Sequence, residues 1–124
     1  AKHGVTSFCG TTMTLSHEKL KEIVKSASGY TAPKSKLVGI NLEGPYIAEA
    51  KAGAQNREFI RPASTKEVDE LLSINDKIKL ITIAPEASDT QDFITKEKEN
   101  LTMATPALPS LHSKRSINVK ISQV

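Results

Sequence analysis

Glu43 has the clearest chemical potential in the chain, because its carboxylate stands where an apolar run stops. Residues 37–42 are almost continuously apolar, which is typical of a strand covered on both faces. Gly44 and Pro45 then end the strand pairing and turn the chain. Ligands of parallel α/β proteins bind at the carboxyl ends of strands, so this position predicts a metal ligand or a general base. The alternative is a carboxylate that is merely the first solvated residue of a loop.

The segment 46–62 is long for a connection between a strand and a helix, and long loops in compact domains tend to be functional. Gly53 allows the backbone to approach a ligand closely. The side chains that could contact a ligand through amides or positive charge are Gln55, Asn56, Arg57 and Arg61. The alternative is an ordinary solvated surface loop.

Other reactive side chains are interpreted as structural. Cys9 is the only cysteine, which excludes an intrachain disulfide and fits a reducing, cytoplasmic location. No neighbouring base could activate it, so we expect a buried structural thiol. His17 is expected to be exposed on the first turn of a helix. Glu86 follows a second strand end and is expected to be structural or loop-capping.

Hydrophobic periodicity predicts strands that alternate with helices. The expected strands are residues 4–9, 37–42, 78–83 and 117–121. Helices are expected from Ser16 to Ser28, from a capping box at Ser64–Glu67 to Asn75, and after Ser88 or Asp89. Residues 103–110 have two prolines and no periodicity, which predicts a loop.

Alternation of this kind predicts an α/β fold with parallel strands and right-handed crossovers. A complete (β/α)8 TIM-type barrel takes about 250 residues. The 124 residues of this chain therefore predict a single partial domain over 1–124, roughly half of such a barrel.

Composition argues against two classes of partner. The net charge is only +3, lysines and acids are interspersed, aromatic residues make up 4%, and Trp is absent, so we expect no nucleic-acid binding. No apolar run approaches the ~20 residues of a membrane span, so we expect no membrane insertion.

Five ordered motifs together resemble a known family. They are Gly4-Val-Thr-Ser-Phe8, Thr11-Thr-Met-Thr14, Asn41-Leu-Glu-Gly-Pro45, Gly53-Ala-Gln-Asn56 and Ala84-Pro-Glu86. The chain resembles N-acetylglucosamine-6-phosphate deacetylases of the amidohydrolase superfamily over residues 1–99, and residues 100–124 form a divergent tail.

The resemblance implies a metal-dependent hydrolase of amino sugar metabolism, which cleaves N-acetylglucosamine 6-phosphate to glucosamine 6-phosphate and acetate. It implies that Glu43 ligates a divalent metal ion, zinc or iron, and that Ala54 and Gln55 contact the amino sugar phosphate. The family often has His at the position of Gln55, so a role that needs histidine is not transferred.

The same resemblance places no catalytic residue in this chain, because the family's general base and its other metal ligands lie outside the matched motifs. We therefore expect the chain to be inactive alone. The alternative is a non-enzymatic α/β module that self-associates or binds sugar phosphate weakly through residues 53–56. An open half-sheet exposes strand edges, so a homo-oligomer or the missing remainder of the barrel is expected to cover it.

Overall fold

The computed structural model describes residues 3–31, 34–85, 90–97 and 102–104. The strands are β1 (Ser7–Thr11), β2 (Lys36–Glu43), β3 (Ile78–Thr82) and β4 (Thr102–Ala104). The α-helices are α1 (His17–Ser28), α2 (Thr65–Ile74) and α3 (Thr90–Glu97), and two short 3-10 helices are η1 (Glu49–Lys51) and η2 (Arg57–Phe59).

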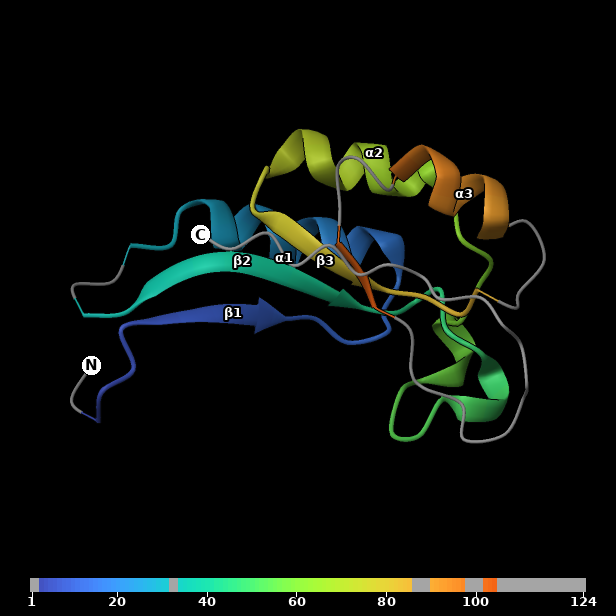
Figure 1. Ribbon diagram of the computed structural model, residues 1–124, viewed down its shortest axis with the longest axis horizontal. Helices are drawn as coiled ribbons and strands as arrows, with labels where there is room; N and C mark the ends of the chain where they lie inside the picture. Colours follow the sequence, from blue (N-terminus) through green and yellow to red (C-terminus); the bar gives the residue numbers. More distant parts are fainter. Residues whose placement is uncertain (1–2, 32–33, 86–89, 98–101, 105–124) are drawn as a thin grey trace.

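The strands form one parallel sheet in the order β1-β2-β3-β4. Each strand therefore lies beside the next one along the chain, with a helix in each connection, as in a (β/α)8 barrel. Figure 1 shows the loop that contains η1 and η2 beyond the carboxyl ends of the strands. The predicted α/β fold of alternating units is confirmed, with four parallel strands among the described residues where a complete barrel has eight.

A single hydrophobic core joins the sheet to the helices. Its buried side chains come from β2 and β3, the segments that follow them, and all three helices: Leu20, Val24, Ile40, Leu42, Tyr46, Val68, Leu71, Ile78, Ile81, Ile83 and Phe93. Each fully buried aliphatic side chain stabilises the fold by about 1.5–3 kcal/mol relative to exposure. This core fixes the sheet against the helices and so fixes where the strand ends lie.

Two helix starts follow from local sequence. The Ser16 hydroxyl accepts a hydrogen bond from the Lys19 amide at 3.3 Å and caps α1. The Ser64 hydroxyl accepts one from the Glu67 amide at 3.3 Å and caps α2. The capping box at this second helix was only half right, because the Glu67 carboxylate bonds to Tyr46 and Arg61 instead.

The prediction of a loop from residue 103 was wrong for its first residues. Thr102–Ala104 forms β4, which pairs in parallel with Leu80–Thr82. Three residues are too few to show a hydrophobic period in the sequence. The strand is recognised only from its backbone pairing with β3. The predicted strand 117–121, Glu86 and the two proposed caps at Ser88 and Asp89 lie outside the described residues, as does most of the tail 100–124.

The burial predicted for Cys9 was also wrong. Cys9 is exposed, because it lies on β1, the edge strand of the described sheet. Partial desolvation still raises the pKa of its thiol, which disfavours the reactive thiolate. Within the described ranges, no helix combines the length and apolar character needed to cross a bilayer.

Candidate functional site

Glu43 is the last residue of β2 and is half-buried. It is in register with Thr82 of β3, which in turn is in register with Ala104 of β4. Three neighbouring strands therefore end at the same level. The carboxylate stands at the carboxyl edge of the sheet, where the sequence placed it.

The turn after Glu43 leaves no room for a side chain. Gly44 has a φ of +81°, and a Cβ atom there would collide with the Thr14 hydroxyl. That hydroxyl donates a hydrogen bond to the Glu43 carbonyl at 3.4 Å. The peptide bond between Gly44 and Pro45 is cis. Glycine is thus required here both by the left-handed backbone and by close packing.

Gln55 connects the long loop to Glu43. Its side-chain oxygen accepts a hydrogen bond from the Thr14 amide at 2.7 Å, and its amide nitrogen donates one to a Glu43 carboxylate oxygen at 3.3 Å. Because both ends of the side-chain amide are used, the Gln55 amide is held in one orientation and restrains one oxygen of the Glu43 carboxylate. The structure brings Glu43 and Gln55 together, whereas Ala54 is exposed beside them.

The structure shows one reason for glycine at position 53, and the expected close approach of a ligand there stays a prediction. A Cβ atom at Gly53 would have no neighbour within 4 Å among the described residues, so no close contact with this part of the chain requires glycine. The backbone φ of +57° at Gly53 favours glycine, because this left-handed conformation is unfavourable for residues with a side chain.

Arg61 is not free to meet an anion, contrary to expectation. Its Nε donates to both carboxylate oxygens of Glu67, at 3.1 and 2.9 Å, and its Nη1 donates to the Leu15 and Phe59 carbonyls. The exposed Arg57 on η2 has no such contacts within the described residues. The prediction of an anion contact therefore remains only for Arg57.

The exposure predicted for His17 was wrong. Its side chain is only 15% exposed, and Nε2 lies 2.9 Å from a Glu70 carboxylate oxygen on α2. The hydrogen bond with His17, helped by the charge of Lys21, lowers the pKa of Glu70 below its ordinary value. The partners are 53 residues apart, so no local signal in the sequence could have paired them.

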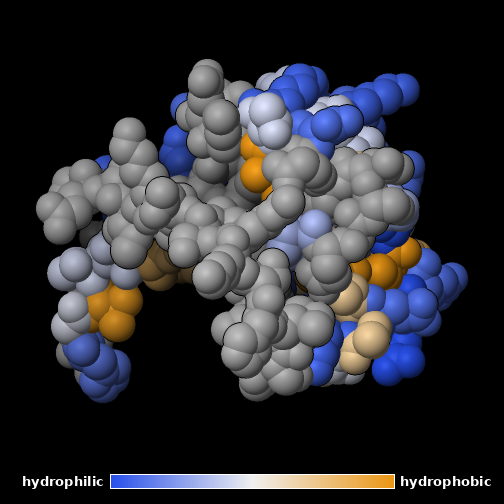
Figure 2. All heavy atoms as spheres, turned by 45° about the vertical axis from the view of Figure 1, so that its right-hand side comes forward, coloured by the Kyte–Doolittle hydropathy of each residue, from blue (hydrophilic) through white to orange (hydrophobic). Residues whose placement is uncertain are grey.

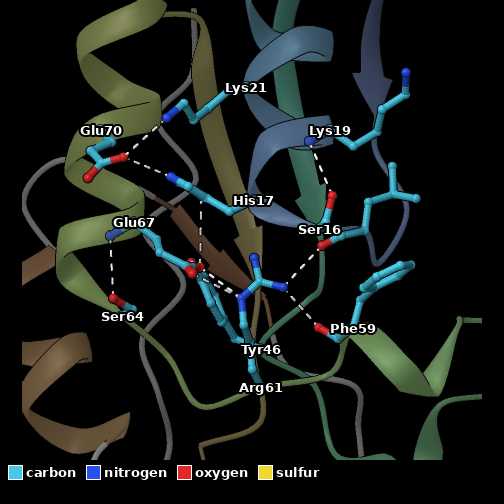
Figure 3. A network of polar contacts seen from close by, with 11 residues as sticks. Ser16, His17, Lys19, Lys21, Tyr46, Phe59, Arg61, Ser64, Glu67 and Glu70 are labelled. Carbon is cyan, nitrogen blue, oxygen red and sulfur yellow. Dashed lines mark hydrogen bonds and ion pairs between the residues drawn. The ribbon is translucent and has the colours of Figure 1, made fainter.

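Tyr46 completes this group of polar contacts, which Figure 3 shows between α1, α2 and the long loop. Its hydroxyl donates to the Glu67 carboxylate at 2.8 Å. Burial, together with the hydrogen bond to that anion, raises the pKa of Tyr46 well above its ordinary value. The phenol therefore stays neutral and acts as a donor.

The described residues alone do not fit a complete metal site. They contain no group of three or more His, Cys, Asp or Glu side chains that could hold an ion. Glu43 offers one carboxylate, and Gln55 already binds one of its oxygens. A catalytic zinc usually has about three protein ligands, so Glu43 could supply only one of them.

No family model matches the chain. Curated relatives do match it. It is 31% identical over 111 residues to N-acetylglucosamine-6-phosphate deacetylase of Bacillus subtilis, which covers 84% of this chain and 28% of that protein. The Homo sapiens enzyme of the same name is 33% identical over 100 residues, covering 74% of this chain and 24% of that protein.

The chain corresponds to a partial segment of N-acetylglucosamine-6-phosphate deacetylases. It spans about a quarter of the length of the curated relatives that it matches.

Solved deacetylase structures have the same fold over this segment. The Thermotoga maritima enzyme is 36% identical with a TM-score of 0.69, covering 82% of this chain and 28% of that chain. A mutant Mycobacterium smegmatis deacetylase in complex with N-acetyl-D-glucosamine-6-phosphate has a TM-score of 0.72 at 24% identity. The match covers 83% of this chain and 27% of that chain. The segment is therefore a fragment of the deacetylase TIM barrel.

Proposed function

We propose that this chain is one segment of a metal-dependent deacetylase that hydrolyses N-acetylglucosamine 6-phosphate to glucosamine 6-phosphate and acetate. The observation that carries the proposal is the position of Glu43, a half-buried carboxylate at the carboxyl edge of a parallel sheet, held by Gln55. The names of the relatives support the reaction. The cytoplasm is the proposed location.

In this proposal Glu43 is one ligand of a divalent ion, zinc or iron. Such an ion, when bound, lowers the pKa of a bound water and polarises the amide carbonyl. The chain's own contribution is to hold the carboxylate still. Gln55 fixes one oxygen of Glu43, and the turn at Gly44 fixes the backbone behind it.

The loop next to this carboxylate is the proposed contact for the amino sugar phosphate. Ala54 is exposed, and Gln55 lies between the loop and the strand end. The deacetylase solved with N-acetyl-D-glucosamine-6-phosphate supports a sugar phosphate as the partner. A substrate hydroxyl would compete with Thr14 or Glu43 for the Gln55 amide.

One observation favours a second function. Glu43 is the only residue proposed as a metal ligand, and the described residues contain no group of three ligands. The chain by itself would then be a non-enzymatic module that binds sugar phosphate weakly through residues 53–56. Both functions assume that the chain alone cannot complete the site. Incubating the chain with zinc or iron and N-acetylglucosamine 6-phosphate tests this assumption, because acetate release by the chain alone would overturn it.

A chimera tests whether the segment is competent in a complete barrel. The matched segment, 84% of this chain, replaces its counterpart in the Bacillus subtilis deacetylase, and acetate release is measured with the parent enzyme as reference. We expect a folded, metal-containing chimera with measurable deacetylation. A chimera with the parent's circular dichroism and metal content but no acetate release would contradict the proposal.

A further inference from the structure

Arg61 contacts several separate segments near the site. Its Nε binds Glu67 of α2, and its Nη1 donates to the Leu15 carbonyl at 3.0 Å and the Phe59 carbonyl at 2.9 Å. Its backbone amide donates to the Pro45 carbonyl at 3.2 Å. Its guanidinium carbon lies 5.9 Å from the centre of the Tyr46 ring. Figure 3 shows the guanidinium between α2 and the end of the long loop.

The contacted residues are chain neighbours of the residues that hold Glu43. Leu15 follows Thr14, whose amide binds Gln55 and whose hydroxyl binds the Glu43 carbonyl. Pro45 belongs to the turn that directly follows Glu43. Phe59 ends η2, at the far end of the loop that contains Gln55. Arg61 therefore contacts chain neighbours of Thr14, Glu43 and Gln55 at the same time.

The arrangement requires an arginine. The planar guanidinium has donors on three nitrogens in fixed directions, so it can bind a carboxylate and two carbonyls at once. A lysine ammonium at this place could keep the charge opposite Glu67 but not all these directions. The Arg61 side chain is 24% exposed, and its Nη2 is buried with no partner within the described residues. The guanidinium thus holds this geometry with little competition from water.

We propose that Arg61 is a positioning residue that fastens the loop 46–62 to the segments around Glu43, so that Gln55 stays bonded to the carboxylate. The inference relies on the proposed function only for what Glu43 does. The fastening itself is a property of this chain and can be measured without metal, substrate or activity.

The Thr14 amide is the reporter for this proposal. Its hydrogen-bond acceptor is the Gln55 side chain, at 2.7 Å, so its exchange with solvent deuterium is slow only while Gln55 stays in place. The Leu20 amide, bonded to the Ser16 carbonyl at the start of α1, and the Asn75 amide, bonded to the Leu71 carbonyl at the end of α2, are the reference amides for opening that is not confined to the loop.

The experiment is amide exchange by NMR on the 124-residue chain and three variants. We expect Arg61→Met to speed Thr14 exchange by about tenfold or more relative to the Leu20 and Asn75 amides, because the loop loses its attachment. Arg61→Lys should have the same selective effect. Arg57→Met, in the same loop but exposed, is the matched control and should change nothing.

Each other result overturns the proposal. Unchanged Thr14 exchange in Arg61→Met, or equal acceleration at all three amides, would show that Arg61 does not act on Gln55 in particular. If Arg61→Met fails to fold, Arg61→Lys decides, and normal Thr14 protection there would contradict the need for the guanidinium. The chimera could still release acetate in each of these cases. Failure of the Arg61 proposal can therefore be distinguished from failure of the proposed function.

Discussion

Gln55 is the side chain that makes Glu43 an oriented carboxylate. It binds the Thr14 amide and a Glu43 oxygen at once, so the amide cannot turn without breaking one of two hydrogen bonds. The Gln55 amide both donates and accepts hydrogen bonds, and it carries no titratable proton.

Tyr46 gives a pH-dependent prediction at the residue scale. Its pKa is raised in the folded chain, whereas an unfolded chain loses the phenol proton near its ordinary value of about 10. Above that pH the unfolded chain binds fewer protons than the folded one, so the free energy of unfolding must fall as pH rises. Below it the contribution of Tyr46 is fully present.

Tyr46→Phe should therefore cost about 0.5–1.5 kcal/mol at neutral pH, through the lost hydrogen bond to Glu67. It should also make the decline of stability from about pH 9.5 to 11 shallower. Denaturant unfolding across this range measures both effects. The matched control is Tyr30→Phe, because Tyr30 is 40% exposed. An equally steep decline of stability in wild type and Tyr46→Phe would show that Tyr46 does not contribute to the loss of stability at high pH.

At the scale of elements, the turn after β2 and the long loop each depend on one glycine, for different reasons. Gly44 combines a positive φ with a collision that a Cβ atom would make with Thr14. Gly53 has only the positive φ. The two positions therefore separate backbone strain from steric crowding.

Gly44→Ala is expected to destabilise the fold by about 2–4 kcal/mol, because strain and overpacking add. Gly53→Ala should cost only about 1 kcal/mol, for the left-handed conformation alone. Thermal or denaturant unfolding of the two variants provides the measurement. Similar losses at both positions would show that the turn after Glu43 is less crowded than the structure indicates.

The elements that the sequence predicted best are those with local signals. Ser16 and Ser64 cap α1 and α2 through amides three residues away, and the apolar stripes of both helices face the core. The short strand β4 was not predicted, because three residues are too few to show a hydrophobic period. Its partner, β3, lies about 20 residues earlier in the chain. The position of Glu43 followed from the end of an apolar run.

The polar contacts around the site could not be predicted from spacing. Arg61 and Leu15 are 46 residues apart, and His17 and Glu70 are 53 apart. Such pairs exist only after α1 packs against α2 and the loop folds back. A Glu three residues after a capping Ser indicated a capping box, but Glu67 has stronger partners in the guanidinium and the phenol.

At the scale of the whole molecule, the chain is a piece of barrel with apolar side chains at its surface. Val5, Phe8 and Val38 are 53%, 37% and 47% exposed, and they lie on or beside β1 and β2. On the face drawn in Figure 2, hydrophobic residues appear as several separate areas. β1 is the edge of the described sheet, so its outer backbone groups are available to another strand.

Association between copies of the chain is the resulting prediction. Sedimentation velocity over a concentration series should show a concentration-dependent increase in mass for the isolated chain. Val38→Lys should shift the distribution toward the monomer, because a charge on this exposed position opposes burial against another copy. Ser26→Lys, on an exposed position of α1, is the control. A wild-type chain that stays monomeric at every concentration would contradict this.

The most direct test of the central claim compares Glu43→Gln with Glu49→Gln in the chimera with the Bacillus subtilis deacetylase. Glu49 is exposed on η1 of the same loop, so its substitution should leave metal content and acetate release unchanged. Glu43→Gln should lower bound metal and reduce acetate release by about 100-fold or more in a folded protein. Unchanged metal content and acetate release in Glu43→Gln would show that this carboxylate is not a metal ligand, which would contradict the proposed function.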